Sequence, residues 1–145
     1  MKKELETKLV KAFPKIYRNY GGDPRKTCMT DFGCGDGWFK IILELSNQLS
    51  SLLDEPGFKK MRAEQVKEKF GGLRFYVKGI TGEAWLKLMS LRYIQKAGDL
   101  SLVTCEECGK PGKRTTTDMG WIKVLCAKCK KEDKRVAKIK ERGIV

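Results

Sequence analysis

Four cysteines in the C-terminal part of the chain have the spacing of a metal site. Cys105 and Cys108 form one C-x2-C pair, Cys126 and Cys129 form a second, and 17 residues separate the two pairs. Each pair can place two thiolates on one ion, and four thiolates at this spacing suit tetrahedral Zn2+. The spacing predicts one structural zinc ion. A rubredoxin-like iron or iron–sulfur centre has the same donor set and stays open as an alternative.

The remaining reactive residues give no second site of comparable strength. The chain has six cysteines and no histidine, so the commonest general base and the commonest nitrogen ligand are both missing. Cys28 and Cys34 are predicted to be buried thiols rather than metal ligands. No nucleophile, base and oxyanion donor can be assembled from the sequence, and we therefore do not expect an enzyme.

The string DFGCGDG at 31–37 resembles the glycine loop of an S-adenosylmethionine-dependent methyltransferase. Such a loop follows a buried parallel strand, which is an apolar run. Here the preceding residues are GDPRKTCMT, and a proline followed by charged residues does not make a central strand. We therefore predict that the match is a mimic: a glycine-rich turn leads into a helix that Asp36 caps, and Trp38 anchors its first turn in the core.

Hydrophobic periodicity predicts an α+β domain over residues 1–101, followed by a small zinc module over 102–145. Helices are expected near 4–19, 36–54 and 81–97, with Pro14 kinking or ending the first. Thr81 and Gly98 are the expected cap and stop of the third helix.

A β-hairpin is expected near 63–78, with Phe70-Gly71-Gly72 between its strands. Alternation places Leu73, Phe75 and Val77 on one face, and Arg74, Tyr76 and Lys78 on the other. A cation beside an aromatic ring can stack a base or a nucleotide, so this second set is a candidate ligand or partner surface. The same pattern also fits the plain solvent-exposed side of a sheet.

The zinc module is expected to contain a hairpin, with Thr115–Thr117 on one strand and Trp121–Leu125 on the other, and a helix after Cys126. A knuckle, a hairpin and a second knuckle that opens a helix resemble a treble-clef or zinc-ribbon arrangement. The module is too small to be held by core burial alone, so metal binding is expected to supply much of its folding energy.

The charge of the chain favours an anionic partner. Lys and Arg number 31 against 18 Asp and Glu, a formal net charge of +13, and such a field attracts phosphate backbones or acidic proteins. A charge that serves only solubility is the alternative. The candidate nucleic-acid contacts are the basic residues of the zinc module: Lys113, Arg114, Lys123, Lys130, Lys131, Lys134, Arg135 and Lys138.

No segment has the length and composition of a membrane span. None of the apolar runs approaches the roughly 18 residues needed to cross a bilayer, and acidic residues interrupt the N-terminal segment. We therefore expect a cytoplasmic protein without membrane contact.

Three strings in the chain resemble a family of small, largely uncharacterised proteins that bacteriophages and prophages encode. They are CGDGW at 34–38, VKEKFGGLRFYV at 66–77, and CEECGKPG…GWIKVLCAKC from 105 to 129. Many relatives end the last knuckle with histidine, whereas this chain has Cys129, which still completes a four-ligand site. The resemblance spans roughly 30–130 and implies a phage-associated context, in the cytoplasm of an infected or lysogenic bacterium. It carries no shared activity.

Three functions fit these observations. The first is a zinc-stabilised accessory protein that binds nucleic acid, and its affinity should fall steeply with salt. The second is a phage-encoded inhibitor or modulator of an acidic host protein of defence or transcription, which should form a stoichiometric complex. The third is a nucleotide or signal-molecule binder that uses Arg74, Tyr76 and a tryptophan. Charge and module type favour the first.

Overall fold

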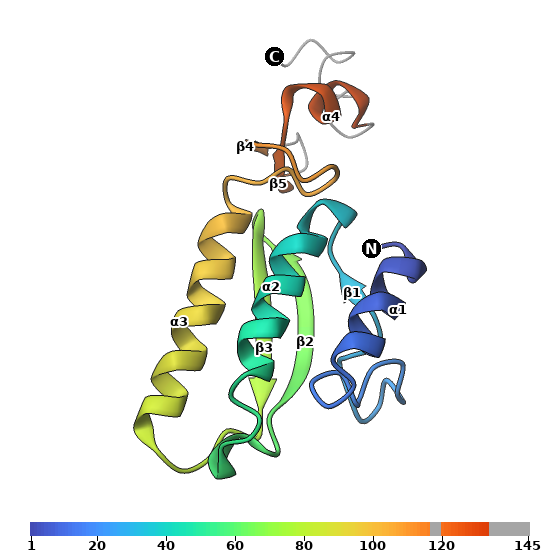
Figure 1. Ribbon diagram of the computed structural model, residues 1–145. Helices are drawn as coiled ribbons and strands as arrows, with labels where there is room; N and C mark the ends of the chain where they lie inside the picture. Colours follow the sequence, from blue (N-terminus) through green and yellow to red (C-terminus); the bar gives the residue numbers. More distant parts are fainter. Residues whose placement is uncertain (117–119, 134–145) are drawn as a thin grey trace.

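A three-stranded sheet with helices on one side forms the larger part of the fold (Figure 1). The structure is a computed structural model that describes residues 1–116 and 120–133. The sheet has the order β1–β2–β3. Along the chain the elements are α1 (Lys3–Ala12), β1 (Phe32–Gly33), α2 (Phe39–Ser50), β2 (Arg62–Lys69), β3 (Gly72–Lys78) and α3 (Ala84–Ser101). The predicted α+β class is confirmed.

The β2–β3 hairpin closes through a two-residue turn. Phe70 and Gly71 both have positive φ, 54° and 82°, as a type I′ turn requires. The turn twists in the same sense as the strands, so pairing begins at once between Lys69 and Gly72. The predicted hairpin is confirmed, except that Gly72 belongs to β3 rather than to the connection.

Strand β1 is an element that the sequence did not predict. It is two residues long and pairs parallel with β2, Phe32 opposite Val66 and Gly33 opposite Lys67. Two residues cannot show a periodicity, and the long-range pairing with β2 defines the strand. The pairing fixes the position of the CGDGW string, which follows β1 directly.

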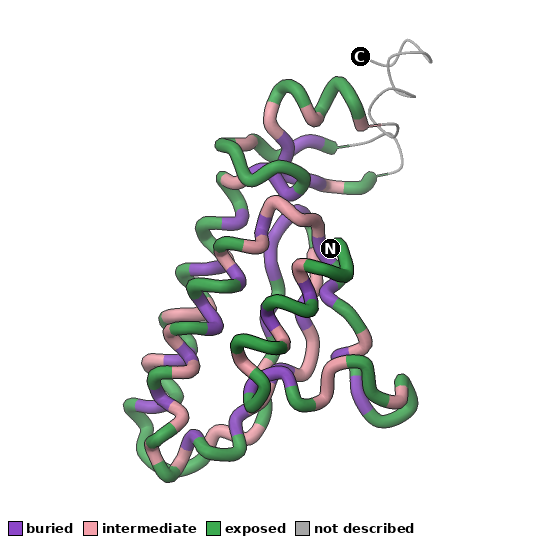
Figure 2. Tube along the Cα trace, turned by 45° about the vertical axis from the view of Figure 1, so that its right-hand side comes forward, coloured by how far each residue is buried: buried purple, intermediate pink, exposed green. Residues whose placement is uncertain are grey.

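The hydrophobic core lies between the sheet and the helices. Side chains of α2 spaced three and four residues apart, Ile42, Leu45 and Leu49, are at most 1% exposed and face the sheet as an amphipathic helix should. Figure 2 shows the buried positions recurring along the inner sides of the helices and strands. The largest fully buried side chains besides these are Leu9, Ile16, Tyr17, Met29, Phe32, Trp38, Phe58, Met61 and Leu86.

A buried carboxylate fastens α1 to β1. Glu6 is 2% exposed, and its Oε1 accepts a hydrogen bond from the Phe32 backbone N–H at 3.0 Å. Its Oε2 accepts from the Tyr20 hydroxyl and from Lys3 Nζ, the latter at 3.5 Å. Each oxygen therefore has a donor, and the cost of burying the charge is offset locally.

Three helix boundaries differ from prediction in the N-terminal half, and one of them is the end of α2, at Ser50 rather than near 54. Helix α1 ends at Ala12 rather than near 19, because Phe13 leaves helical geometry and Pro14 follows. Asp36 does not cap α2; it begins a 3-10 turn, Asp36–Trp38, and its Oδ1 accepts from the Lys2 backbone N–H at 2.7 Å.

The predicted limits of α3 are also wrong. Thr81 is not the cap, because its backbone N–H donates to Gly57 O at 2.8 Å and the helix begins at Ala84. Gly98 is not the stop; it lies inside the helix, where a Cβ would sit 3.7 Å from Leu73 O. Helix α3 continues to Ser101. The Ser101 Oγ accepts a hydrogen bond from the Leu73 backbone N–H at 2.9 Å, and this bond connects α3 to β3.

The described part of the predicted zinc module, residues 102–116 and 120–133, lies beyond the end of α3, at the top of Figure 1. It contains a hairpin of β4 (Lys113–Thr116) and β5 (Ile122–Leu125), followed by α4 (Ala127–Glu132). Knuckle, hairpin and helix follow in the treble-clef order. Thr117, predicted to belong to the first strand, lies outside the described residues. None of the described helices has the length and apolar content to cross a membrane.

Trp38 links the core to the zinc module and gives a test of the packing. The predicted anchoring is confirmed: its side chain is fully buried, and its Nε1–H donates to Thr104 O at 3.0 Å.

Trp38→Phe should lower the free energy of unfolding of the zinc-loaded chain by about 1–3 kcal/mol, because the Thr104 carbonyl loses its donor. Urea denaturation measures the change. Trp85→Phe, at an exposed position, is the control and should stay within about 0.5 kcal/mol of the parent; equal effects would contradict the prediction.

Candidate metal centre

The four cysteines predicted as ligands come together in space. The Sγ atoms of Cys105, Cys108, Cys126 and Cys129 all lie within 4.8 Å of one another, and the Cys108 and Cys126 sulfurs are 3.6 Å apart. A tetrahedral zinc ion with Zn–S near 2.3 Å separates its sulfurs by about 3.8 Å. A disulfide needs about 2.05 Å. The arrangement is that of a metal site, and its donor set fits Zn2+.

The first pair of cysteines lies in a tight knuckle. The Cys105 backbone N–H donates to Lys110 O at 2.7 Å, and the Gly109 N–H donates back to Cys105 O at 2.9 Å. The Glu106 N–H donates to Val124 O at 2.9 Å. The knuckle is therefore bonded both to itself and to β5, which leads directly into the second pair.

The second pair lies at the start of α4. Cys126 is the N-cap of this helix, and its Sγ accepts from the Cys129 backbone N–H at 3.4 Å. This hydrogen bond lowers the pKa of Cys126 to about 7, because it stabilises the thiolate over the thiol. The thiolate is the metal-binding form, so this hydrogen bond favours coordination by Cys126, whereas burial raises the pKa of Cys129.

The two glycines of the CGDGW string lie against the backbone of the first cysteine knuckle, where no side chain fits. A Cβ on Gly37 would lie 2.1 Å from Cys105 O, and one on Gly35 would lie 2.3 Å from Glu106 O. Both separations are shorter than any van der Waals contact. The Gly37 N–H also donates to Glu106 O at 2.7 Å. The methyltransferase-like string thus receives protein backbone where a cofactor loop would receive its ligand.

The turn of the β2–β3 hairpin also contacts the module. A Cβ on Gly71 would lie 3.1 Å from Ile122 Cγ2, and Arg114 Nη2 donates to Phe70 O at 3.3 Å. The three strings on which the resemblance rests therefore meet around one end of the sheet. The zinc module contacts the rest of the fold through the CGDGW turn and through the Phe70-Gly71 turn.

Lys123, predicted as a nucleic-acid contact, is occupied inside the module. It is 8% exposed, and its Nζ lies 2.5 Å from Glu107 Oε1 and 3.7 Å from Asp133 Oδ2. A buried lysine held by two carboxylates links the first knuckle to the residue after α4. The sequence pattern could not show this pairing, because the three residues are far apart along the chain.

The other predicted cations lie on the surface where they are described. Lys113 and Arg114 are exposed on β4, and Lys130 and Lys131 are exposed on α4. Lys134, Arg135 and Lys138 lie outside the described residues.

Cys28 and Cys34 do not join a metal site: among residues 1–116 and 120–133, only the four-cysteine cluster has the geometry. Cys34 is buried as predicted, and burial raises its pKa to about 12. The prediction for Cys28 is wrong, because its side chain is exposed. Thr27 and Met29 on either side are buried, so the residue between them faces solvent.

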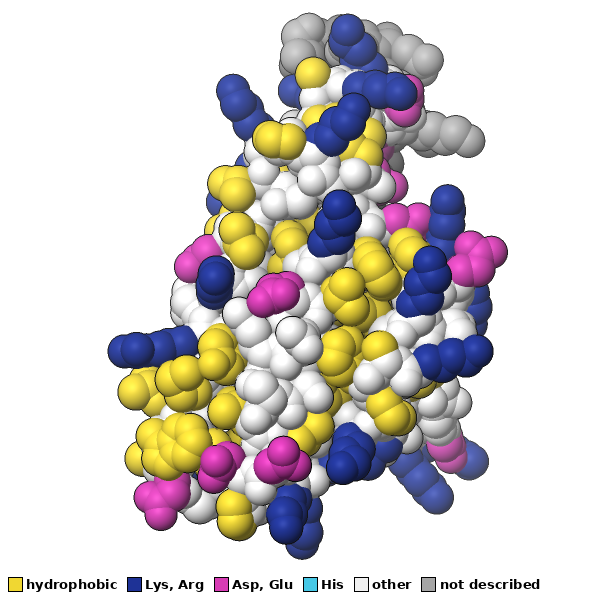
Figure 3. Space-filling model, viewed as in Figure 1, with side chains coloured by type: hydrophobic (Ala, Val, Ile, Leu, Met, Phe, Trp, Pro, Cys, Tyr) yellow, Lys and Arg dark blue, Asp and Glu magenta, His cyan; other side chains and the backbone are white. Residues whose placement is uncertain are grey.

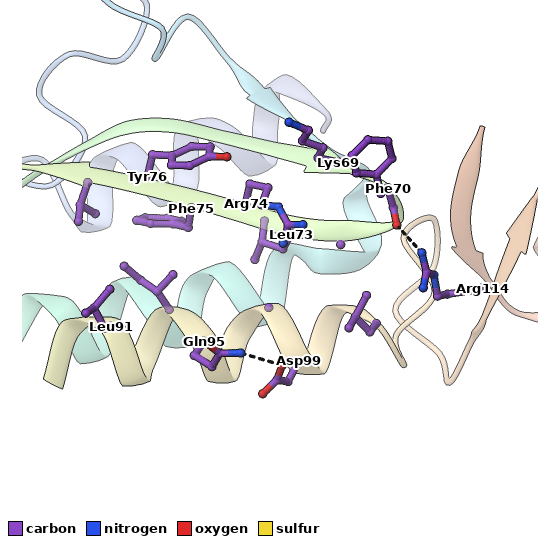
Figure 4. Close-up of a pocket in the computed structure, with 15 residues that line it drawn as sticks. Lys69, Phe70, Leu73, Arg74, Phe75, Tyr76, Leu91, Gln95, Asp99 and Arg114 are labelled. Carbon is purple, nitrogen blue, oxygen red and sulfur yellow. Dashed lines mark hydrogen bonds between the residues drawn. The ribbon is translucent and has the colours of Figure 1, made fainter. Parts of the chain in front are cut away.

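Arg74, Tyr76 and Lys78 share one exposed face of the sheet, as predicted. Lys78 Nζ pairs with Glu64 Oε1 at 3.4 Å. Arg74 and Tyr76 also border a groove of about 770 Å³ between β3 and α3 (Figure 4).

Comparisons with protein-family models, with curated protein sequences and with solved structures gave no match. The interpretation of the site therefore rests on its own geometry.

The metal content of the purified chain tests the four-cysteine cluster. We expect one zinc ion per chain by elemental analysis, with no visible absorption, whereas iron bound to thiolates would colour the protein. Cys105→Ser should lower the zinc content to well below one and destabilise the module, because three thiolates hold the ion less tightly. Cys28→Ser is the matched control and should keep full zinc. Full zinc in both variants would rule out Cys105 as a ligand.

We call the contact between the CGDGW turn and the first cysteine knuckle the seam. The close approach at Gly37 predicts that a change in the seam alters metal binding. Gly37→Ala forces the knuckle away from the CGDGW turn and should destabilise the zinc-loaded chain by about 1–3 kcal/mol. Competition with a chelator should show weaker zinc binding than in the parent. Gly98→Ala is the control, since its Cβ meets only ordinary contacts and alanine favours a helix interior. Equal zinc affinity in the two variants would show that the seam does not support the site.

Proposed function

We propose that this chain is a zinc-stabilised accessory protein of phage type that binds nucleic acid through the basic surface of its zinc module. The observation that carries the proposal is the sorting of charge within that module. Outside the Lys123 cluster, its exposed charged side chains over 105–116 and 120–133 are six cations and one carboxylate, Glu132. The cations are Lys110, Lys113, Arg114, Lys128, Lys130 and Lys131.

Such a surface suits the phosphate backbone. Lysine and arginine side chains that are free to move contact phosphates without reading sequence, and they release counterions when they bind. Figure 3 shows Lys and Arg side chains spread around the end of the molecule that the module forms. The zinc ion would act structurally: it would hold the knuckle and α4 together and so keep the cations of β4 and α4 on one rigid support.

The phage-associated context rests on the three resembling strings. Their meeting around one end of the sheet supports reading them as parts of a single structural unit rather than as three separate coincidences. An inhibitor of an acidic host protein would use the same cations, so the experiment must separate the two partners.

An electrophoretic mobility shift with the zinc-loaded chain tests the proposal. Duplex DNA, single-stranded DNA and RNA should all be shifted at about 50 mM salt, and the affinity should fall by at least about tenfold by about 200 mM. Lys130→Glu with Lys131→Glu should weaken binding to duplex DNA strongly, because two phosphate contacts become repulsive. Lys8→Glu with Lys11→Glu makes the same change of charge at exposed positions on α1, outside the module, and is the control.

Two results would contradict the proposal. Absence of any shift at low salt would exclude nucleic-acid binding and leave the acidic host protein as the partner to seek by pull-down. An equal loss in both double variants would show that only total charge matters and that the module surface has no special role.

A further inference from the structure

One face of the sheet is left open by the helices. The register pairs Lys67 with Arg74 and Gln65 with Tyr76, so these side chains share a face. The alternate residues Leu73 and Phe75 are 4% exposed and belong to the core. We call the first side the open face. Its side chains are all exposed or half-buried: Arg62, Gln65, Lys67, Lys69, Arg74, Tyr76 and Lys78.

The open face is strongly basic. Five of its seven side chains are Lys or Arg, and the carboxylate that pairs with one of them is Glu64, on Lys78. Within the described part of the chain, the other four cations make no ion pair: Arg62, Lys67, Lys69 and Arg74. An ordinary solvated sheet face mixes charges of both signs, so four unpaired cations on one small face point to an anionic ligand.

Two aromatic rings lie among these cations. Tyr76 is 43% exposed and Phe70, at the tip of the hairpin, is 62% exposed. Lys69 Nζ lies 5.6 Å from the centroid of the Phe70 ring. In Figure 4 Tyr76 lies on the side of β3 opposite Phe75, away from α3. Exposed rings between cations are the combination that stacks unpaired bases while the phosphates are neutralised.

The open face continues onto the zinc module and into a groove. Arg114 reaches from β4 to the Phe70 carbonyl, which carries the line of positive charge past the hairpin tip. Lys69, Arg74 and Arg114 also border the groove between β3 and α3. Strand β3 spans about 20 Å at roughly 3.3 Å per residue, a length that accommodates several nucleotides.

We propose that the open face is a second nucleic-acid site and that it takes single strands. Lys67, Lys69 and Arg74 bind phosphates, and Tyr76 and Phe70 stack bases. Bases in a duplex are already stacked and cannot lie on a ring, so the aromatic part of this surface selects unpaired strands. This inference rests on the proposed function, because it divides nucleic-acid binding between two surfaces of one protein.

The test is fluorescence anisotropy of the zinc-loaded full chain with labelled oligothymidylate and oligouridylate of about 12 nucleotides. Tyr76→Ala should weaken single-strand binding about tenfold and leave the salt dependence unchanged, because it removes stacking. Tyr76→Phe keeps the ring and should bind like the parent. Lys67→Ala with Arg74→Ala should weaken binding and reduce the slope of log K against log salt by about 1.4, as two lost phosphate contacts on a single strand require.

Controls separate this inference from the proposed function. Lys8→Ala with Lys11→Ala removes the same charge on α1 and should have little effect. A loss of single-strand binding only in Lys130→Ala with Lys131→Ala would overturn the inference and leave the proposed function standing. No binding of any nucleic acid would overturn both. Equal binding of a polyglutamate peptide would also overturn it and would indicate an acidic polypeptide as the ligand. Thermal unfolding of each variant verifies that the fold is kept.

Discussion

The structure depends on a close approach of two backbones, the CGDGW turn and the first cysteine knuckle. Gly37 donates to Glu106 O at 2.7 Å, and neither Gly35 nor Gly37 has room for a side chain. The indole of Trp38 completes the seam by donating to Thr104 O. Because the knuckle also carries two of the four thiolates, metal coordination and core packing share the same few residues. A zinc ion would therefore stabilise the position of the module on the domain as well as the module itself.

Some charged side chains hold the fold together, and others lie free on its surface. Glu6 accepts three hydrogen bonds where α1 meets β1, and the exposed Glu107 together with Asp133 holds the buried Lys123. The lysines and arginines of β3, β4 and α4 remain largely outside. These exposed cations contribute to the positive field of a chain whose net charge is +13.

The two basic surfaces lie on parts of the fold that are held in different ways. The module presents cations on a hairpin and a short helix whose geometry depends on the thiolate cluster. The open face presents cations and rings on a sheet that is held by the hydrophobic core on its other side. The Phe70-Gly71 turn, which touches both, joins them. In our two proposals the module contacts phosphates alone, and the open face contacts phosphates together with unpaired bases.

The sequence alone determined the features whose signal is local. The C-x2-C pairs predicted the four-cysteine cluster, and alternation predicted the two faces of β3, because ligand spacing and strand period are properties of neighbouring residues. Caps and ends were less predictable: Gly98 looks like a stop until β3 is seen beside it. Only the tertiary structure revealed β1, the pairing of Lys123 and the role of Gly35 and Gly37. Each of these depends on a partner at least ten residues away along the chain. A close backbone contact between distant segments requires a glycine, which the sequence shows, but the sequence does not show which segment that glycine contacts.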